Sequence, residues 1–362
     1  MITLVIVQHL AITYSGLGDW YYKEPANLGF MQYNVFLFYL TFTQGYFMGI
    51  LFFIAGHFIP ASYDRKGFRK FIKDRLVRLG VPTVFYIFII NPIITDVIMG
   101  FMDSHSFFQD YAKNITSLRF IGDTGPLWFT FALLAFTVFY AVFRKIVFIK
   151  VNARKDKVPG TAKIIALALF IGVCTFCVRA ALPVGTVIFN MRLGYFAQYI
   201  ILFIVGIISK RNEWLEKLTY AKGRPWMITA LALGLLRLAL LFLNNDPNAD
   251  YSAYNGGLNP QSAFNSLWES FVSVSMSIGL IAVFKEKMKA QNKLIKAMSE
   301  NAFAVFVFHA PVIVALTQLF APVHLYPALK FIILVFSGIP ICFLLTHFTV
   351  RKIPALKKMT AG

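Results

Sequence analysis

The apolar run Phe30-Met-Gln-Tyr-Asn-Val-Phe-Leu-Phe-Tyr-Leu-Thr-Phe-Thr-Gln-Gly-Tyr-Phe-Met-Gly-Ile-Leu-Phe-Phe-Ile-Ala-Gly-His57-Phe58 decides the fold of this chain. It exceeds the roughly 20 residues with which a helix crosses the hydrocarbon of a bilayer. Similar runs recur along all 362 residues, of which 58% are hydrophobic and 14% charged. A water-soluble core of this length would need more polar surface to cover it. We therefore predict an all-α integral membrane protein, a bundle of about ten transmembrane helices.

The predicted spans form one membrane domain, residues 1–350, followed by a basic tail at 351–362. We place the spans at 1–16, 30–58, 79–101, 124–143, 164–180, 192–209, 225–243, 264–284, 299–320 and 328–349.

The positive charge of the chain, +19 net, lies mainly in alternate connections. Of 35 Lys and Arg residues, 28 fall in 59–78, 144–163, 210–224, 285–298 and 350–362. Positive residues gather on the cytoplasmic side of membrane proteins, so we predict that both termini are cytoplasmic. Because the charge follows the topology, it indicates contact with membrane lipids and argues against a nucleic-acid partner.

The first span is short and begins at Met1, with about 16 apolar positions and no basic residue before it. Transmembrane helices usually have a longer apolar stretch and a cytoplasmic charge anchor. We therefore expect that the first helix is N-terminally truncated and that the natural protein starts upstream of Met1.

Ionisable side chains lie within several predicted spans. His9 is in the first, Arg237 in the seventh, Glu269 in the eighth and His309 in the ninth. Such residues are costly at membrane depth and usually mark function. Imidazole is also well suited to proton transfer near neutral pH. Glu269 and Arg237 are open to two interpretations, a structural buried ion pair or a catalytic role.

Three further features bear on ligands or on the membrane interface. Arg75 and Arg78 lie one helical turn apart in the basic turn 59–78 and could clamp phosphate, although topology alone also explains basic residues there. The outer loop 244–260 is rich in polar side chains and fits either a solvated loop or a surface for a polar substrate. Trp128 opens the fourth span, where aromatic residues often line the membrane interface.

Two functions fit these residues. An enzyme would take a phosphorylated donor at the cytoplasmic face and an acceptor outside, with the deep histidine between them. A proton-coupled transporter or exporter of a sugar or lipid-linked sugar would use His9, Glu269 and Arg237 as a proton relay. Transporters usually show broken helices in matching halves, and no such pair is evident in this sequence.

Several blocks of the sequence resemble those of the membrane acyltransferase-3 family, the bacterial O-acyltransferases of glycans. His9, in Val7-Gln8-His9-Leu10, resembles the catalytic histidine of the first helix. Leu51-Phe52-Phe53-Ile54-Ala55-Gly56 resembles the Phe-Phe-x-x-Ser-Gly block, with Ala55 in place of Ser. Arg75-Leu-Val-Arg78 resembles the Arg-x-x-Arg motif. Gly125-Pro-Leu-Trp128 and the stretch from Ser299 through His309-Ala-Pro311 resemble the later blocks. The stretch from His9 to Tyr22 is most similar to a subgroup that includes periplasmic glucan succinyltransferases.

The resemblance implies an O-acyltransferase of the bacterial inner membrane. It would move acetyl or succinyl from acyl-coenzyme A, a co-substrate, to a cell-surface or periplasmic carbohydrate, with no tightly bound cofactor and no metal. His9 would be the general base or would carry the acyl group, and Glu269 and His309 would assist. Arg75, Arg78 and Trp128 would bind the donor. The family usually has a basic residue eleven positions before the histidine, which here would precede Met1.

Overall fold

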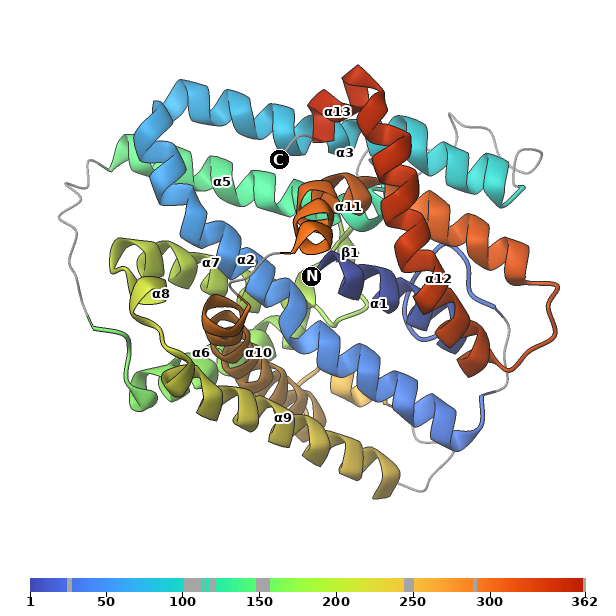
Figure 1. Cartoon of the computed structure of the whole chain (residues 1–362). Coiled ribbons are helices and arrows are strands. Elements are labelled where there is room, and N and C mark those ends of the chain that lie inside the picture. The colour runs from blue at the N-terminus through green and yellow to red at the C-terminus, as the bar shows by residue number, and fades with distance from the viewer. Residues whose placement is uncertain are drawn as a thin grey trace.

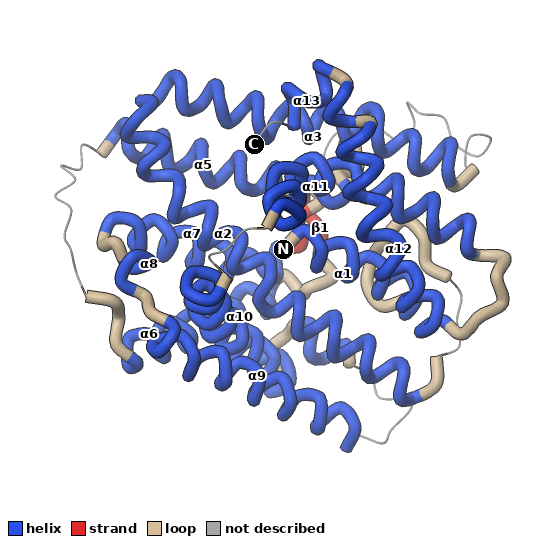
Figure 2. Tube along the Cα trace, in the orientation of Figure 1, coloured by secondary structure: helices blue, strands red, loops and turns tan. Residues whose placement is uncertain are grey.

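The computed structural model describes residues 1–24, 28–100, 112, 115–117, 122–147, 157–243, 251–288 and 292–360. Figure 2 shows that these residues are mostly helical, with short loops between the helices and one short pair of strands. The α-helices are α1 (Ile2–Ser15), α2 (Phe30–Arg75), α3 (Val81–Phe85), α5 (Trp128–Ile146), α6 (Thr161–Ala181), α7 (Phe196–Arg211), α8 (Trp214–Lys217), α9 (Tyr220–Leu243), α10 (Pro260–Lys287), α11 (Lys293–Phe320), α12 (Pro327–Phe348) and α13 (Pro354–Thr360).

Shorter elements join these helices. They are the π-helical segments η1 (Leu76–Gly80), η2 (Tyr86–Ile90) and η3 (Ile93–Ile98), the 3-10 turns η4 (Gly125–Leu127), η5 (Leu193–Tyr195), η6 (Ser252–Asn255) and η7 (Val350–Lys352), and the strands β1 (Val187–Ile188) and β2 (Met191–Arg192).

The helices confirm an all-α integral membrane protein. Within the described residues, eight helical segments are long and apolar enough to cross a bilayer. One of them runs from Phe30 to Ile98 and covers the predicted span 30–58 and the predicted span 79–101 as far as Ile98, while Phe101 lies outside the described residues. The first predicted span is the 14-residue helix α1, which is apolar but shorter. Each of the ten predicted spans therefore overlaps a helix of the described residues. The cytoplasmic placement of both termini stays a prediction.

The predicted turn 59–78 is mostly helical. α2 continues through it to Arg75, and the chain direction changes at Gly67, whose backbone is non-helical at φ 69° and ψ 171°. A positive φ is costly for residues with a Cβ, so glycine suits this position. Figure 1 shows α2 crossing the molecule diagonally and turning sharply at the upper left. Two membrane spans are thus joined by an elbow of one residue rather than by a loop.

α2 packs most extensively against α7, through two glycines. A Cβ on Gly56 would overlap the carbonyl oxygen of Phe203, and one on Gly206 would overlap that of Phe53. Small residues allow membrane helices to approach closely where packing drives association. Next to this contact, the buried His57 Nδ1 lies 2.7 Å from Ser209 Oγ. The Phe-Phe-x-x-Ala-Gly block therefore ends where two backbones touch.

The connections between spans are also folded onto the bundle. The hairpin β1–β2 turns through Phe189 and Asn190, both at positive φ. Asn190 Nδ2 donates to Gly122 O at 2.6 Å, and Arg192 pairs with Asp19. At the other end of the chain, α13 contacts α11 and α3 and buries Met359. The basic tail thus packs as a helix, as far as Thr360. In the outer loop, residues 244–250 lie outside the described residues.

Candidate active site

His9 lies on α1 beneath the turn that follows the helix. The chain reverses at Gly16, whose φ of 71° is left-handed, and the Gly16 N–H caps α1 by donating to Ile12 O. The returning segment is held to α1 where the Glu24 N–H donates to Thr13 O at 2.9 Å. This reversal places the Trp20 indole on His9, with ring centroids 3.7 Å apart and planes 13° from parallel.

His309, on α11, lies beside the same imidazole. Its ring centroid is 5.3 Å from that of His9 and its side chain is fully buried. His309 Nδ1 lies 2.8 Å from Phe306 O and 3.2 Å from Val305 O. A carbonyl oxygen only accepts hydrogen bonds, so Nδ1 carries the hydrogen. In the neutral imidazole, Nε2 is then the nitrogen with a free lone pair.

The three rings leave three nitrogens unbonded. The Trp20–His309 separation is 6.4 Å, so the three centroids form a nearly right-angled triangle with the right angle at His9. His309 therefore lies to the side of the imidazole, and Trp20 covers its face. His9 Nδ1, Trp20 Nε1 and His309 Nε2 are buried without a hydrogen-bond partner. Buried polar groups are normally bonded, so a cluster of unbonded ones points to a site that binds or reacts.

The turn before α5 closes onto this site. Tyr21 donates to Asn91 Oδ1 at 2.8 Å and shares a 3.0 Å hydrogen bond with the Tyr86 hydroxyl. Gly125 has a φ of 45°, and a Cβ there would crowd the hydroxyls of Tyr21 and Tyr86. The Gly-Pro-Leu-Trp block is therefore shaped by its contact with the turn that carries Trp20.

Trp128 is partly buried within a group of aromatic rings. It lies parallel to Tyr199, with centroids 6.1 Å apart. The ring contacts continue from there to the histidine pair, through Phe52 against Tyr199 and Phe129, Phe129 against Phe306, and Phe306 against His309. Trp128 and His309, far apart in the sequence, are therefore connected by contiguous aromatic side chains.

Arg75 and Arg78 occupy different environments. Arg75 is partly buried, packs over the Phe71 ring at 4.9 Å and donates to Ser62 Oγ at 3.4 Å. Arg78 is exposed. The segment η1, which contains Arg78, is π-helical, and its wider turn changes the expected one-turn spacing of the two residues. Arg75 thus faces the bundle and Arg78 faces outward.

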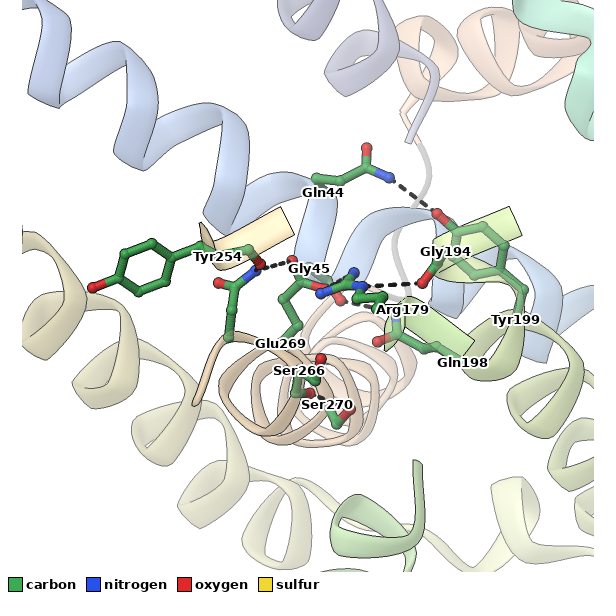
Figure 3. Close-up of polar contacts among 11 residues, drawn as sticks. Gln44, Gly45, Arg179, Gly194, Gln198, Tyr199, Tyr254, Ser266, Glu269 and Ser270 are labelled. Atoms are coloured by element: carbon green, nitrogen blue, oxygen red, sulfur yellow. Dashed lines mark hydrogen bonds and ion pairs between the residues drawn. The ribbon is translucent and has the colours of Figure 1, made fainter. Parts of the chain in front are cut away.

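Glu269 is held in a separate polar cluster (Figure 3). Its carboxylate pairs with Arg179 Nη2 at 2.5 Å and accepts from Asn265 Nδ2 at 3.2 Å. Arg179 is fully buried, donates from Nε to Gly194 O at 3.0 Å and lies over the Tyr195 ring. Among the described residues, these bonds connect Glu269 with neither histidine. A role for Glu269 in assisting His9 stays a prediction.

The expectation that Arg237 is the partner of Glu269 is wrong. Arg237 is buried, and its guanidinium lies 4.9 Å from the Tyr254 ring and 5.7 Å from the rings of Phe264 and Trp268. α10 packs against both α6 and α9, and the carboxylate meets the arginine on α6. Cation–π contacts with three rings provide Arg237 with an alternative to an ion pair.

Sequence reasoning about single residues passed over Arg179 and Trp20. Arg179 lies at the end of the predicted span 164–180, where a basic residue costs little, so its position carries a weaker signal than that of Glu269. Trp20 gave a weaker signal, an aromatic residue just after Gly16 and Gly18, which are typical of a reversal of the chain. In the part of the chain that the structure describes, no three His, Cys, Asp or Glu side chains are placed to hold a metal ion.

Comparison with known proteins assigns most of the chain to one kind of domain. A family model described as an acyltransferase domain matches residues 1–347. No curated protein and no solved structure matches the chain. The match runs from α1 into α12, so the histidine pair, the arginines of the α2 elbow and the Arg179–Glu269 pair lie within one domain.

Proposed function

Because this chain belongs to the membrane acyltransferase-3 family, we propose that it transfers an acetyl or succinyl group from cytoplasmic acyl-coenzyme A to a hydroxyl of an extracytoplasmic carbohydrate. Family membership and the apolar helices establish a multi-pass membrane protein with an acyltransferase domain. The donor, the acceptor and the bacterial inner membrane as its location belong to the proposal. The observation that carries it is the pair of imidazoles with unbonded nitrogens at His9 and His309.

His9 is the general base in this proposal. An imidazole nitrogen takes the proton of a sugar hydroxyl as the oxygen attacks the thioester carbonyl. The C–S bond then breaks, an ester forms, and the coenzyme A thiolate takes the proton from the imidazolium. Such proton transfer typically contributes 10²–10⁴-fold to a rate. His309 Nε2 is a free acceptor beside His9 and would hold an acceptor hydroxyl in place.

The donor would enter from the cytoplasmic end of α2. Arg75, half-buried at the elbow, would contact the phosphates of coenzyme A, because guanidinium groups bind phosphate oxygens in a fork. The thioester would then reach His9 along the aromatic rings from Trp128 to Phe306. Exposed Arg78 would act at long range by attracting the anionic donor.

Consumption of acyl-coenzyme A by purified, reconstituted protein tests this proposal, with acetyl and succinyl donors in parallel and a glycan extract as acceptor. Wild type should turn over one donor, and His9→Ala should not. His324→Ala removes an exposed histidine between α11 and α12 and should match wild type. Turnover that survives in His9→Ala would overturn the catalytic assignment. A wild type inactive with both donors would return the protein to the transporter interpretation.

A further inference from the structure

The elbow of α2 gathers arginines from two other helices. Asp64 accepts from Arg211 Nη1 at 2.6 Å and from Arg144 Nη2 at 3.4 Å. Arg211 also donates to the Tyr140 hydroxyl at 3.3 Å. Arg144 ends α5 and Arg211 ends α7, so these ion pairs fix both helix ends to α2. Figure 1 shows the ends of α5 and α7 on the side of the molecule where α2 turns.

Aromatic rings connect this pair of arginines with Arg75. Arg144 lies over the Tyr63 ring at 5.6 Å, and Tyr63 contacts the Phe71 ring edge-on at 5.4 Å. The guanidinium of Arg75 lies over the same Phe71 ring and donates to Ser62. The tripeptide Ser62-Tyr63-Asp64 therefore organises three arginines, which come from α2, α5 and α7.

The positive charge of this cluster exceeds its negative charge. Two guanidinium groups, those of Arg144 and Arg211, share the Asp64 carboxylate, and Arg75 forms no ion pair among the described residues. Asp74, which precedes Arg75 in the sequence, is paired with Lys66 at 2.5 Å. The side chains of Arg144 and Arg211 are 14% and 24% exposed, and Arg144 Nε is buried without a partner. Two guanidinium groups on one carboxylate, together with the unbonded Arg144 N–H, indicate a binding site for an anion that has several oxygen atoms.

We propose that Arg144 and Arg211 bind the 3′-phosphate of the coenzyme A donor, while Arg75 contacts its diphosphate. This inference rests on the proposed function, which supplies the donor. Two arginines on one carboxylate suit a phosphate monoester, which carries up to two negative charges, and the separate Arg75 suits the diphosphate. Anionic lipid headgroups share this phosphate chemistry, so the test separates the two sources.

Binding of free coenzyme A and of 3′-dephospho-coenzyme A to the full-length protein tests this assignment without catalysis. Calorimetry would use nanodiscs of phosphatidylcholine alone and nanodiscs that also contain phosphatidylglycerol. Wild type should bind coenzyme A about 10- to 100-fold more tightly than the dephospho form, the range expected for hydrogen bonds to a charged group. Arg144→Gln and Arg211→Gln should each lower coenzyme A affinity and leave affinity for the dephospho form nearly unchanged.

Two control variants accompany these measurements. Arg224→Gln removes an exposed arginine from the start of α9 and should bind like wild type. Arg144→Lys retains the charge that faces Asp64 and should fold, yet lose part of the preference for coenzyme A because lysine lacks the guanidinium fork.

The remaining outcomes are distinct. Equal affinity of wild type for both ligands, or coenzyme A affinity unaffected by Arg144→Gln and Arg211→Gln, overturns this inference and leaves the proposed function intact. Failure of wild type to bind either ligand in phosphatidylcholine overturns the donor in the proposed function itself. Coenzyme A binding that is abolished by phosphatidylglycerol assigns the arginines to lipid headgroups and also overturns the inference.

Discussion

The histidine site and the Arg179–Glu269 cluster are both buried and polar, yet their side chains are bonded differently. Both charges of the cluster are matched and both oxygens of Glu269 accept hydrogen bonds, which leaves Arg179 Nη1 as the one nitrogen of this ion pair without a partner among the described residues. In the histidine site the rings only contact one another, and three nitrogens have no partner. A buried polar group without a partner is costly. We infer that the cluster holds helices together and that the open nitrogens await a substrate.

The strongest test of this contrast is His9→Ala. Loss of a general base should lower kcat by about 10²–10⁴-fold. The side chain makes no hydrogen bond among the described residues, so its removal should leave the midpoint of thermal unfolding close to that of wild type. Single-turnover kinetics and a melting curve in detergent measure the two effects. If His9→Ala lowered the unfolding midpoint and retained the wild-type kcat, His9 would be a structural residue rather than a catalytic one.

Glu269→Gln should have the opposite effects, a large loss of stability and little change in kcat. It leaves Arg179 as a buried cation without a counter-charge, and breaking such pairs costs about 3–5 kcal/mol. The unfolding midpoint should fall sharply, while the molecules that remain folded keep turnover near wild type. The double change Arg179→Met with Glu269→Leu should recover most of the stability. Normal melting together with lost turnover would place Glu269 in the chemistry.

His309→Asn sharpens the comparison within the active site. Asparagine retains an N–H that can donate to Phe306 O but has no atom at the position of Nε2. We expect kcat to fall by about tenfold, since the loss is one hydrogen bond to the reacting groups. His309→Gln places an amide near Nε2 and should recover part of that loss. Equal rates for the two variants would exclude a specific role for Nε2.

The smallest effect should come from Trp20→Ala. Aromatic contacts of this kind contribute about 0.5–1.5 kcal/mol, so kcat should fall roughly 2- to 10-fold as the His9 ring loses its support. The apparent KM for the donor should not change, because the ring contacts of Trp20 are with His9, Tyr21 and His309 and not with the arginines. Trp20→Phe restores the stacked face, and any deficit that persists measures the indole N–H. A change in donor KM alone would contradict the positioning role.

The sequence predicted the spans well and the side-chain partners less well. The predicted span 124–143 corresponds to α5, which begins at Trp128 after the turn η4 at Gly125. Spans can be predicted this closely because the length of an apolar run determines whether a helix crosses the membrane. The position of Glu269 inside a span marks it as notable in the sequence. Its partner is not evident there, because the rotations of α6, α9 and α10 about their axes decide which arginine the carboxylate meets. Trp20 reaches His9 only because Gly16 reverses the chain.

The separation of Arg179 and Glu269 by 90 residues has a consequence for biosynthesis. α6 is made well before α10, so Arg179 enters the membrane without its counter-charge. Arg179 lies in the last turn of α6, where an arginine costs less than the about 2.5–3.5 kcal/mol of a position at the helix centre. The mean hydropathy of 2.3 over the most apolar part of Thr161–Ala181 offsets that cost and lets the helix insert alone. The Arg179–Glu269 ion pair then forms when α10 packs against α6. Assembly of this part of the bundle therefore has to wait until α10 has been synthesised.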